Sequence, residues 1–490
     1  MANEVATEMD THYDVLAQVL AKVKNARTDL MQQSPPLDAK PASPPGAKDP
    51  ASSVVQMCKA AVAHYGPTSF REHSLALDVP IHWLELDSHE NFPCVLPTDL
   101  LQKMSQIDCV PKLVGDAEPS AIKDILLTYW RRFAKEFPSH QVLQRAGADA
   151  IPLCRTFPCY IHGDEGRALK RSGVMILSLQ GAIGKGSRPF QVRHKLKTIK
   201  SLKQGLNVGG NSFNSRLLFA AMPRRYYAQK PSVYRSLVRT LVQTLRTLQD
   251  RGFSWRNEQW RVVTVGLKGD LPFLTKTARL ERHYLRAARK DENRSKAVGV
   301  CAHCMAGTEN VPAEDFNENA AWRSVPCSVP WKAEAPPEFL ELYHVPDRPE
   351  AFVKTDVWHN FHGGAGKDFV ASALVECLVL VESEASSFPR RVEAWSKHDD
   401  TRQYLAFLEW FLKENEDAVQ NNSILVKIQV ATEAINRAFS TLYSSGLWLT
   451  RTEAEVAGRN GRIWLEQYAL LANEAYEAGY ITHTVPGCRE

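Results

Sequence analysis

Residues 158–182, PCYIHGDEGRALKRSGVMILSLQGA, predict a β-hairpin around which the rest of the chain is organised. Two apolar runs of strand length, 159–162 and 174–179, flank a polar stretch that is typical of a turn. Asp164 and Glu165 stand beside two glycines where the first run ends. A carboxylate in this position can face an open cleft without being buried unpaired, as a Mg²⁺ ligand must. Taken alone, both acids also fit the role of ordinary turn residues.

A second apolar run, residues 259–271 (QWRVVTVGLKGDL), leads to another acid, Asp270. Between the two regions, the sequence predicts a strand at residues 216–221 and a helix at residues 232–251. The order is therefore strand, strand, strand, helix, strand, with acids at the ends of the first and fourth strands. This order predicts an α/β fold with a ribonuclease H-like mixed sheet, in which those two strands are neighbours. Their carboxylates then meet at one rim and predict a divalent-metal site.

Length and composition indicate an ordinary globular protein. The chain has 490 residues, of which 44% are apolar and 23% charged. The first ten residues lack the basic start and apolar stretch of a signal peptide. The longest apolar run, residues 369–381, is too short to span a bilayer. Ten cysteines at irregular spacing suggest a reducing compartment. We therefore expect a nuclear or cytoplasmic protein that is neither secreted nor held in a membrane.

Positive charge is concentrated in one stretch. Residues 166–249 contain 17 lysines and arginines and no acidic residue, whereas the remainder of the chain is net acidic. A polyanion such as DNA is the natural partner of this stretch, although a solvated basic face would have the same composition. Tyr226, Tyr227 and Tyr234 lie among the arginines and are expected to stack on bases. The predicted nucleic-acid-binding residues are Arg188, Arg193, Lys195, Lys197, Lys200, Lys203, Arg224 and Arg225.

Composition and periodicity divide the chain into predicted segments. Residues 1–32 are expected to form an amphipathic helix, 33–53 a proline-rich linker, and 54–150 a small, mostly helical accessory domain. Residues 151–382 form the ribonuclease H-like core with a Cys-x-x-Cys insertion, and 383–490 form a helical C-terminal region.

Helical periodicity is clearest in two places. In the accessory domain, residues 120–137 predict a helix that Ser120 caps and that turns Trp130 away from its buried side. The buried positions expected there are Ile122, Ile125, Leu126, Tyr129 and Phe133. In the C-terminal region, residues 401–420, 423–443 and 452–478 predict helices. The tryptophans expected in its core are Trp395, Trp410, Trp448 and Trp464.

Cys301 and Cys304 form a Cys-x-x-Cys pair, whose thiolates can reach one tetrahedral ion. We expect structural Zn²⁺ here, with His359 and His362 of DVWHNFH as partners, because their spacing also suits one ion. The same spacing also occurs in unligated buried thiols and in redox-active pairs. The alternative partners are Cys327 and His303.

Four features together resemble a eukaryotic cut-and-paste DNA transposase of the ribonuclease H-like, three-carboxylate superfamily. They are the HGDEG hairpin, the GDLP strand exit, the Cys-x-x-Cys pair and the helical C-terminal third, which together span residues 158–471. The resemblance implies that Asp164 and Asp270 are the first two catalytic acids and that they hold Mg²⁺ or Mn²⁺. In such a site one ion activates a water or a 3′-hydroxyl, and the other stabilises the leaving oxygen during cleavage or strand transfer.

The sequence leaves the third acid open. We expect Asp368, in a helix predicted at residues 366–382 after a fifth strand at residues 352–358. Glu376 on the same helix face and Glu433 in a later helix are alternatives. If no third acid is present, the protein is a catalytically inactive, transposase-derived nucleic-acid-binding protein. A zinc-organised interaction scaffold is a further alternative, and homo-oligomerisation is left open.

Overall fold

The computed structural model describes residues 79–87, 89–147, 151–168, 172–208, 215–284, 298–381 and 401–479. All of them belong to one compact unit that runs from Asp78 to Glu490. The predicted N-terminal helix (residues 1–32) and proline-rich linker (residues 33–53) lie outside the described residues.

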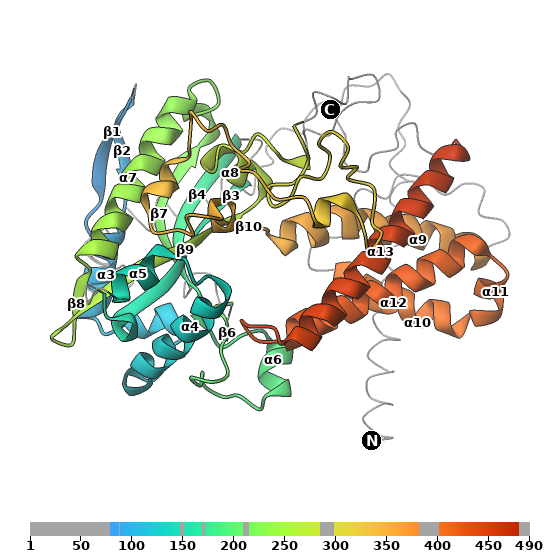
Figure 1. Ribbon diagram of the computed structural model, residues 1–490, viewed down its shortest axis with the longest axis horizontal. Coiled ribbons are helices and arrows are strands. Elements are labelled where there is room, and N and C mark those ends of the chain that lie inside the picture. Colours follow the sequence, from blue (N-terminus) through green and yellow to red (C-terminus); the bar gives the residue numbers. More distant parts are fainter. Residues whose placement is uncertain are drawn as a thin grey trace, which may run out of the picture. The chain divides into compact units, whose positions relative to one another are not determined.

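A curled, mixed β-sheet forms the centre of this unit (Figure 1). Strands β3 and β4 are antiparallel, as are β4 and β7, whereas β9 runs parallel to β3 and β10 parallel to β9. A short strand, β8 (Phe253–Trp255), pairs with the start of β9. In spatial order the main strands are β10 (Val353–Lys354), β9 (Glu258–Gly269), β3 (Thr156–Ala168), β4 (Ser172–Gly181) and β7 (Arg216–Pro223).

The predicted mixed α/β fold is confirmed, with two corrections to its strands. The first strand does not end before Asp164, because β3 continues through Ala168 and Asp164 pairs with Ile176 of β4. Backbone pairing does not require apolar side chains, so the polar residues after His162 still extend the hairpin. The predicted fifth strand is reduced to the two residues of β10.

Helix α7 (Pro231–Asp250) packs against β9 and follows the predicted pattern closely. Pro231 occupies the first turn, where its missing N–H costs nothing. The buried side chains recur at helical spacing: Val233, Leu237, Leu241, Leu245 and Leu248. Gly252 follows with φ of +75°, a conformation that ends the helix and favours glycine.

The described residues before the sheet form a hairpin followed by three α-helices. Their apolar side chains share one hydrophobic core with the sheet. The alternating pattern of HWLEL in β1 is that of a strand with one buried face. The elements are β1 (His82–Leu86), β2 (His89–Cys94), α3 (Pro97–Gln106), α4 (Ile122–Glu136) and α5 (Gln141–Gly147).

Helix α4 begins later than predicted, because a 3₁₀ turn at Pro119–Ala121 precedes it, and no side chain caps it. The five apolar positions predicted to be buried are buried. Trp130 is also buried, at 1% exposure, and so does not lie on an outer side. Its indole Nε1 donates to the carbonyl oxygen of Thr156 at 2.9 Å, which docks α4 onto the first residue of β3.

The C-terminal part is helical, as predicted, and has a second hydrophobic core of its own. Trp464 belongs to this core, whereas Trp448 packs against the first core. Trp410 is 41% exposed, so its predicted burial is wrong, and Trp395 lies outside the described residues. The helices are α9 (Gly366–Val381), α10 (Thr401–Glu414), α11 (Glu416–Gln420), α12 (Ser423–Ser444) and α13 (Arg451–Glu477).

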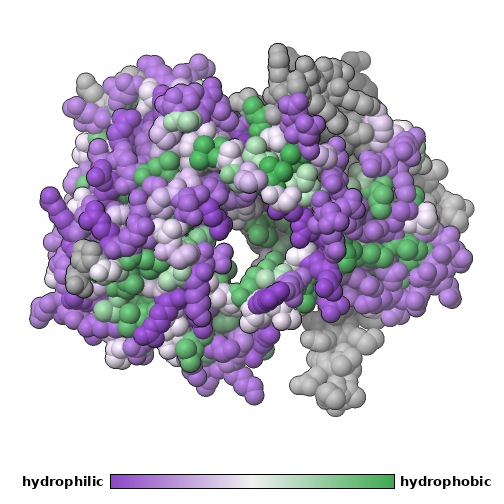
Figure 2. Space-filling view, in the orientation of Figure 1, coloured by the Kyte–Doolittle hydropathy of each residue, from purple (hydrophilic) through white to green (hydrophobic). Residues whose placement is uncertain are grey.

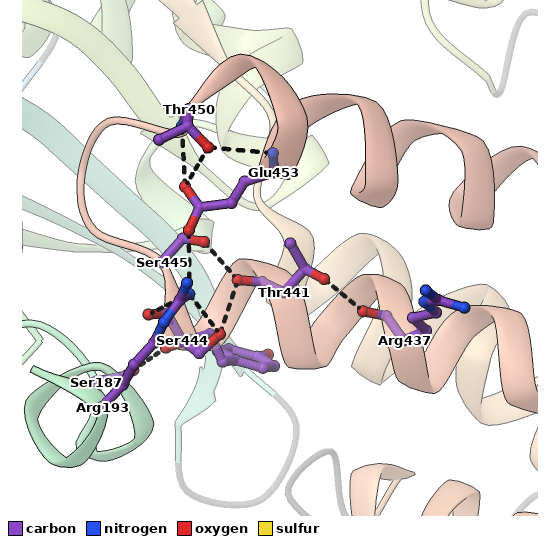
Figure 3. Close-up of polar contacts among 9 residues, drawn as sticks. Ser187, Arg193, Arg437, Thr441, Ser444, Ser445, Thr450 and Glu453 are labelled. Carbon is purple, nitrogen blue, oxygen red and sulfur yellow. Dashed lines mark hydrogen bonds and ion pairs between the residues drawn. The ribbon is translucent and has the colours of Figure 1, made fainter.

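A polar network joins the sheet-bearing part to these helices (Figure 3). The hydroxyl of Ser187, which caps α6 (Arg188–Arg193), donates to the carbonyl oxygen of Tyr443 in α12. Arg193 donates to Glu453 of α13 at 3.0 Å. Glu453 also forms a capping box with Thr450, so one carboxylate both starts α13 and holds α6.

Four shorter elements complete the description of the fold. They are α8 (Leu271–Thr277), the paired strands β5 (Ile183–Gly184) and β6 (Gly205–Leu206), and a π-helical turn (Trp358–Ala365) that leads into α9.

Within the described ranges, none of the helices is both long and apolar enough to cross a membrane. The face drawn in Figure 2 is mostly hydrophilic and carries only small, separate hydrophobic patches.

Candidate functional site

The register of two parallel strands brings Asp164 and Asp270 together. Gly163 of β3 pairs with Gly269 of β9, and each aspartate is the next residue along its strand. Both glycines are required by close packing. A Cβ atom on Gly163 would lie 2.1 Å from the Phe273 ring, and one on Gly269 would lie 1.9 Å from the Gly163 carbonyl oxygen. The two aspartates therefore lie on adjoining strands, as the sequence predicted.

Asp270 leaves the sheet as the N-cap of α8. Its Oδ1 accepts the N–H of Phe273 at 2.8 Å, and its Oδ2 accepts the N–H of Glu165 in β3 at 3.2 Å. Burial raises the pKa of Asp270, and the negative charge of Asp164 raises it further, against the opposing effect of the two N–H groups. The negative charges of Asp164 and Asp270 thus repel one another, and the N–H groups bound to Asp270 compensate this repulsion only in part.

A third carboxylate, Asp356, joins them from the end of β10. Its oxygens accept the backbone N–H of Trp358 at 2.9 Å and contact His359 Nδ1 at 3.1 Å. The other ring nitrogen of His359, Nε2, lies 3.8 Å from Asp164 Oδ1. His359 therefore stands between two of the acids. We call Asp164, Asp270, Asp356 and His359 the acid cluster.

The pKa values within the acid cluster reflect this arrangement. The hydrogen bond to Asp356 raises the pKa of His359, burial opposes the rise, and the charges of Asp356, Asp164 and Asp270 add to it. Burial acts to raise the pKa of Asp356, but its bond to His359 and the N–H groups of the following turn lower it overall. The imidazolium form of His359 is thus a partial counter-charge to the acids.

Asp356 was not singled out from the sequence, although a signal was present. It follows a strand that neighbours β9, so the strand-end rule that identified Asp270 applies to it as well. The expected third acid, Asp368, lies exposed in the first turn of α9, and its charge acts on Tyr468 of α13. Glu433 lies 3.9 Å from Lys413 among the C-terminal helices. Glu376 lies further along α9, beside Cys377.

Glu165 has a structural role next to the acid cluster. Its side chain is only 8% exposed and forms an ion pair with Lys276 of α8. Arg224 lies 3.9 Å from its other oxygen. Because both cations compensate Glu165, it is not a fourth uncompensated acid.

The predicted nucleic-acid-binding residues are all exposed, but they fall into two groups. Arg224 and Arg225 follow β7, and Arg224 reaches Glu165 beside the acid cluster. Arg193 is held by Glu453. The other group follows β5, beyond the end of β4 that is remote from Asp164, and Figure 1 shows α6 far from α8. That group consists of Arg188, Arg193, Lys195, Lys197, Lys200 and Lys203.

The tyrosines expected to stack on bases are not available for it. Tyr227 and Tyr234 are each 3% exposed and belong to the core, where the Tyr234 hydroxyl contacts that of Thr277. Tyr226 packs partly buried against the same core, below the guanidinium of Arg225. They were misassigned because aromatic residues among arginines suit a helix core as well as a binding surface.

The Cys-x-x-Cys pair forms a compact turn. The backbone N–H groups of His303 and Cys304 donate to Cys301 Sγ, the former at 3.3 Å, and that of Ala306 donates to Cys304 Sγ. A hydrogen bond from Cys304 lowers the pKa of the Cys301 thiol to about 6. Cys327 lies close enough that its charge acts on Cys304 and that the charge of Cys301 acts on it. Arg282 donates to the Cys327 sulfur at 3.2 Å.

The predicted partners His359 and His362 are engaged elsewhere. His359 belongs to the acid cluster, and Nε2 of the buried His362 contacts the Tyr443 hydroxyl at 2.6 Å. In the part of the chain that the structure describes, three or more Cys, His, Asp or Glu side chains are nowhere gathered closely enough to hold a metal ion. The four-residue group Cys301, Cys304, His359 and His362 is therefore not assembled.

No family model matches the chain, and no curated protein is detectably similar to it. Its chemistry has to be argued from its own residues. In the acid cluster, partly compensated carboxylates that follow separate strands lie near one another, and oxygen donors of this kind suit a hard divalent cation.

Proposed function

We propose that this protein is a transposase-like, DNA-binding protein that cleaves or transfers phosphodiester bonds with the help of Mg²⁺ or Mn²⁺. The convergence of Asp164, Asp270 and Asp356 at the rim of the sheet carries the proposal. Carboxylates from adjoining strands are the ligands that metal-assisted phosphodiester chemistry uses. The acid-free, basic stretch of residues 166–249 supports a polyanionic partner.

The strand order supports a ribonuclease H-like core for this site. Three successive antiparallel strands, β3, β4 and β7, are followed by α7, and β9 then joins the free side of β3 in parallel. β10 extends the sheet beyond β9. This is the order that the sequence predicted from its two aspartates.

The residues fit a hard cation by their chemistry. The raised pKa of Asp270, caused by burial and by the charge of Asp164, means that a positive charge nearby would relieve repulsion. His359 supplies part of that charge in its protonated form. As they are arranged here, the described side chains are not drawn together to coordination distance.

Each residue of the acid cluster has a role in the proposed chemistry. Asp164, whose side chain is 37% exposed, is the most open of the three acids and would hold the cation together with Asp270. Asp356 orients His359, whose Nε2 faces Asp164 and can accept or release a proton there. Bound metal ions would activate the attacking hydroxyl and stabilise the leaving oxygen.

The first experiment is Mn²⁺-dependent nicking of a supercoiled plasmid. We expect Asp164→Asn, Asp270→Asn and Asp356→Asn each to lower the nicking rate at least about a hundredfold, because each removes a charged oxygen donor. Asp368→Asn is the matched control, since Asp368 lies in α9 and acts on Tyr468 instead. It should nick at the wild-type rate.

Two results would reject the assignment. Retained nicking by Asp164→Asn or Asp270→Asn would remove the site altogether. Loss of nicking in Asp368→Asn, with retention in Asp356→Asn, would restore Asp368 as the third acid and leave Asp356 with a structural role. Melting temperatures of all four variants exclude unfolding as the cause.

A second candidate is a catalytically inactive nucleic-acid-binding protein that keeps the same fold. The engagement of both Asp270 oxygens by backbone N–H groups favours it, because those oxygens are already used to cap α8 and to bind β3. The same assay separates the two candidates. Salt-sensitive DNA binding without Mn²⁺-dependent nicking of the wild-type protein would select the inactive one.

For the Cys-x-x-Cys turn we propose structural Zn²⁺ held by Cys301, Cys304 and Cys327. N–H groups directed at Cys301 favour its thiolate form, which is the form that binds zinc, whereas the hydrogen bond to Cys301 and burial raise the pKa of Cys304. Cys327 replaces the histidines as the third partner because its charge acts on Cys304, although the three sulfurs are not at coordination distance as they are arranged here. A zinc-organised scaffold without nuclease activity would contain the same zinc group and an idle acid cluster.

A further inference from the structure

One face of the sheet is partly exposed beside the acid cluster, although His162, Ser178 and Gln180 on it are buried. Residues directly opposite one another in a sheet share a face, as do alternate residues of one strand. Asp164 is opposite Ile176, and His162, two residues earlier, is opposite both Ser178 in β4 and Lys268 in β9. These side chains therefore share one face.

The same register continues to the edge strand β7. Ser178 is opposite Leu218, and Gln180 is opposite Arg216. Leu218 is 48% exposed and Ile176 is 40% exposed, so this part of the face is uncovered by the described residues. Helix α8 lies on the other face, where its Phe273 ring is in contact with Gly163.

Two cations lie on this partly exposed face. Burial and, to a smaller extent, the charge of Arg216 lower the pKa of Lys268 to about 8. Burial lowers the pKa of His162, and the charges of Arg216 and Lys268 contribute to its value of about 3. Arg216, Lys268 and His162 are therefore close neighbours, although they come from three strands.

Neither of the two long cations has a carboxylate partner within the described ranges. The Lys268 ammonium lies 5.6 Å from the centre of the Tyr160 ring, and Arg216 is exposed. Asp356 is the acid whose charge acts on Lys268, and it belongs to the acid cluster. Like charges held together without a counter-ion form a ready site for an anion.

We propose that Arg216 and Lys268 bind a backbone phosphate of the nucleic-acid strand next to the phosphate that the acid cluster attacks. The exposed Leu218, two residues from Arg216 on β7, and Ile176, opposite Asp164, would contact the sugar or base of that strand. This inference rests on the proposed function, and it names the surface on which the substrate lies. It uses other residues than the basic loop after α6, although Arg216 is opposite Gln180, close to the end of β4 that leads to β5 and α6.

A nucleic-acid strand matches this surface better than another anion does. Its phosphates suit the two cations, and its sugars and bases suit the exposed apolar side chains beside them. The acid cluster at the end of the same face would then lie next to a phosphodiester bond of the bound strand. A small anion would leave Ile176 and Leu218 exposed.

The test measures binding of a fluorescein-labelled DNA duplex over a series of KCl concentrations, in an Asp164→Asn background so that no cleavage occurs. We expect Arg216→Gln and Lys268→Gln each to weaken binding about tenfold and to reduce the log–log salt slope by about 0.9, the value for one phosphate contact on duplex DNA. Lys268→Arg keeps the charge and should bind like the background protein.

The matched control is Arg451→Gln, which removes a fully exposed arginine, with a side chain 93% exposed, at the start of α13. It should change neither affinity nor slope. The double variant Lys195→Gln/Lys197→Gln tests the basic loop as the competing surface. If Lys268→Gln does not fold, the exposed Arg216→Gln alone decides the result.

The outcomes separate this inference from the proposed function. Unchanged binding in Arg216→Gln, with loss confined to the loop variant, would overturn the phosphate site and leave the nuclease proposal intact. Reduced affinity and slope in Arg216→Gln support the phosphate site even if the wild-type protein fails to nick plasmid. A background protein whose binding does not depend on salt would overturn both.

Discussion

The pKa of His359 depends on the charges of the three aspartates in the acid cluster. Asp356 and the other two aspartates raise its pKa. A raised histidine pKa contributes stability that is fully present below the ordinary value of about 6.5 and is lost as pH rises through the higher value in the folded protein. The charge on His359 therefore stabilises the metal-free fold mainly on the acidic side of neutrality.

From this we predict that His359→Gln destabilises the chelator-treated protein more at about pH 6 than at pH values well above the raised pKa. Thermal melting over a pH series measures the difference. Asp356→Asn should also bring the pKa of His359, followed by NMR, down toward its ordinary value. Asp368→Asn should not change it. An equal destabilisation by His359→Gln at all pH values would contradict the role assigned to the imidazolium.

At the level of single residues, the sequence identified the acids that follow long strands and missed the one that follows a short strand. Asp164 and Asp270 stand out because β3 and β9 are apolar runs of strand length. Asp356 lies within residues 352–358, which were predicted as a strand, but the strand ends at Lys354, so Asp356 was not recognised as an acid at a strand end. The pairing of β10 with β9 joins residues more than eighty positions apart in the chain, and sequence periodicity does not contain that information.

Among the elements, the contact of β3 with α8 fixes the position of Asp270. Gly163 leaves room for the Phe273 ring, which is fully buried. Gly163 and Gly166 of β3 therefore differ in whether they can be replaced by a larger residue. Gly163 has a ring where a Cβ would be, whereas Gly166 in the same strand has nothing within 4 Å of that position.

We predict that Gly163→Ala destabilises the protein by about 1–3 kcal/mol and lowers nicking, because α8 must shift to admit the methyl group. Gly166→Ala should be neutral or stabilising by up to about 1 kcal/mol, since it only restricts the unfolded chain. Urea unfolding compares the two variants. Equal stability of both would show that α8 is free to move away from β3.

Elements with a long, regular pattern were predicted well, and short ones were not. Helices α7, α12 and α13 lie within a few residues of their predicted bounds, because each repeats an apolar face over several turns. The hairpin β1–β2 was missed, since five or six residues offer little periodicity. The predicted N-cap of α4 failed because a 3₁₀ turn took the place of Ser120.

On the scale of the whole molecule, the described parts of the connection between α8 and β10 contain little regular structure. These parts, residues 278–284 and 298–352, hold only short 3₁₀ turns and isolated bridges. Arg282 fastens it by donating to the carbonyl oxygens of Cys301 and Ser328. A metal held by the three cysteines would supply a cross-link between residues 301 and 327 that secondary structure does not.

We therefore predict close to one bound Zn²⁺ per chain, measured by elemental mass spectrometry of the purified protein. Cys304→Ser should abolish zinc binding and lower the melting temperature, and a chelator should lower the melting temperature of the wild-type protein but not of that variant. Cys154→Ser removes a partly buried thiol outside the group and serves as the control. Metal-free wild-type protein with an unchanged melting temperature would exclude the zinc proposal.

The two hydrophobic cores were foreseen only in part at this scale. A helical C-terminal part was predicted, and it has its own core around Leu408 and Leu425. The predicted accessory domain shares the core of the sheet, because Trp130 and its neighbours pack onto β3. Helix periodicity shows that one side of α4 is buried but does not say against which partner.

Asp270 has two competing roles at the sheet rim. The oxygens that begin α8 and bind β3 are the same oxygens that a cation would need. Ion occupancy and the order of the first turn of α8 are then thermodynamically linked, so each would weaken the other. The first turn of α8 would therefore become less ordered when a cation binds Asp270 and more ordered when the cation dissociates.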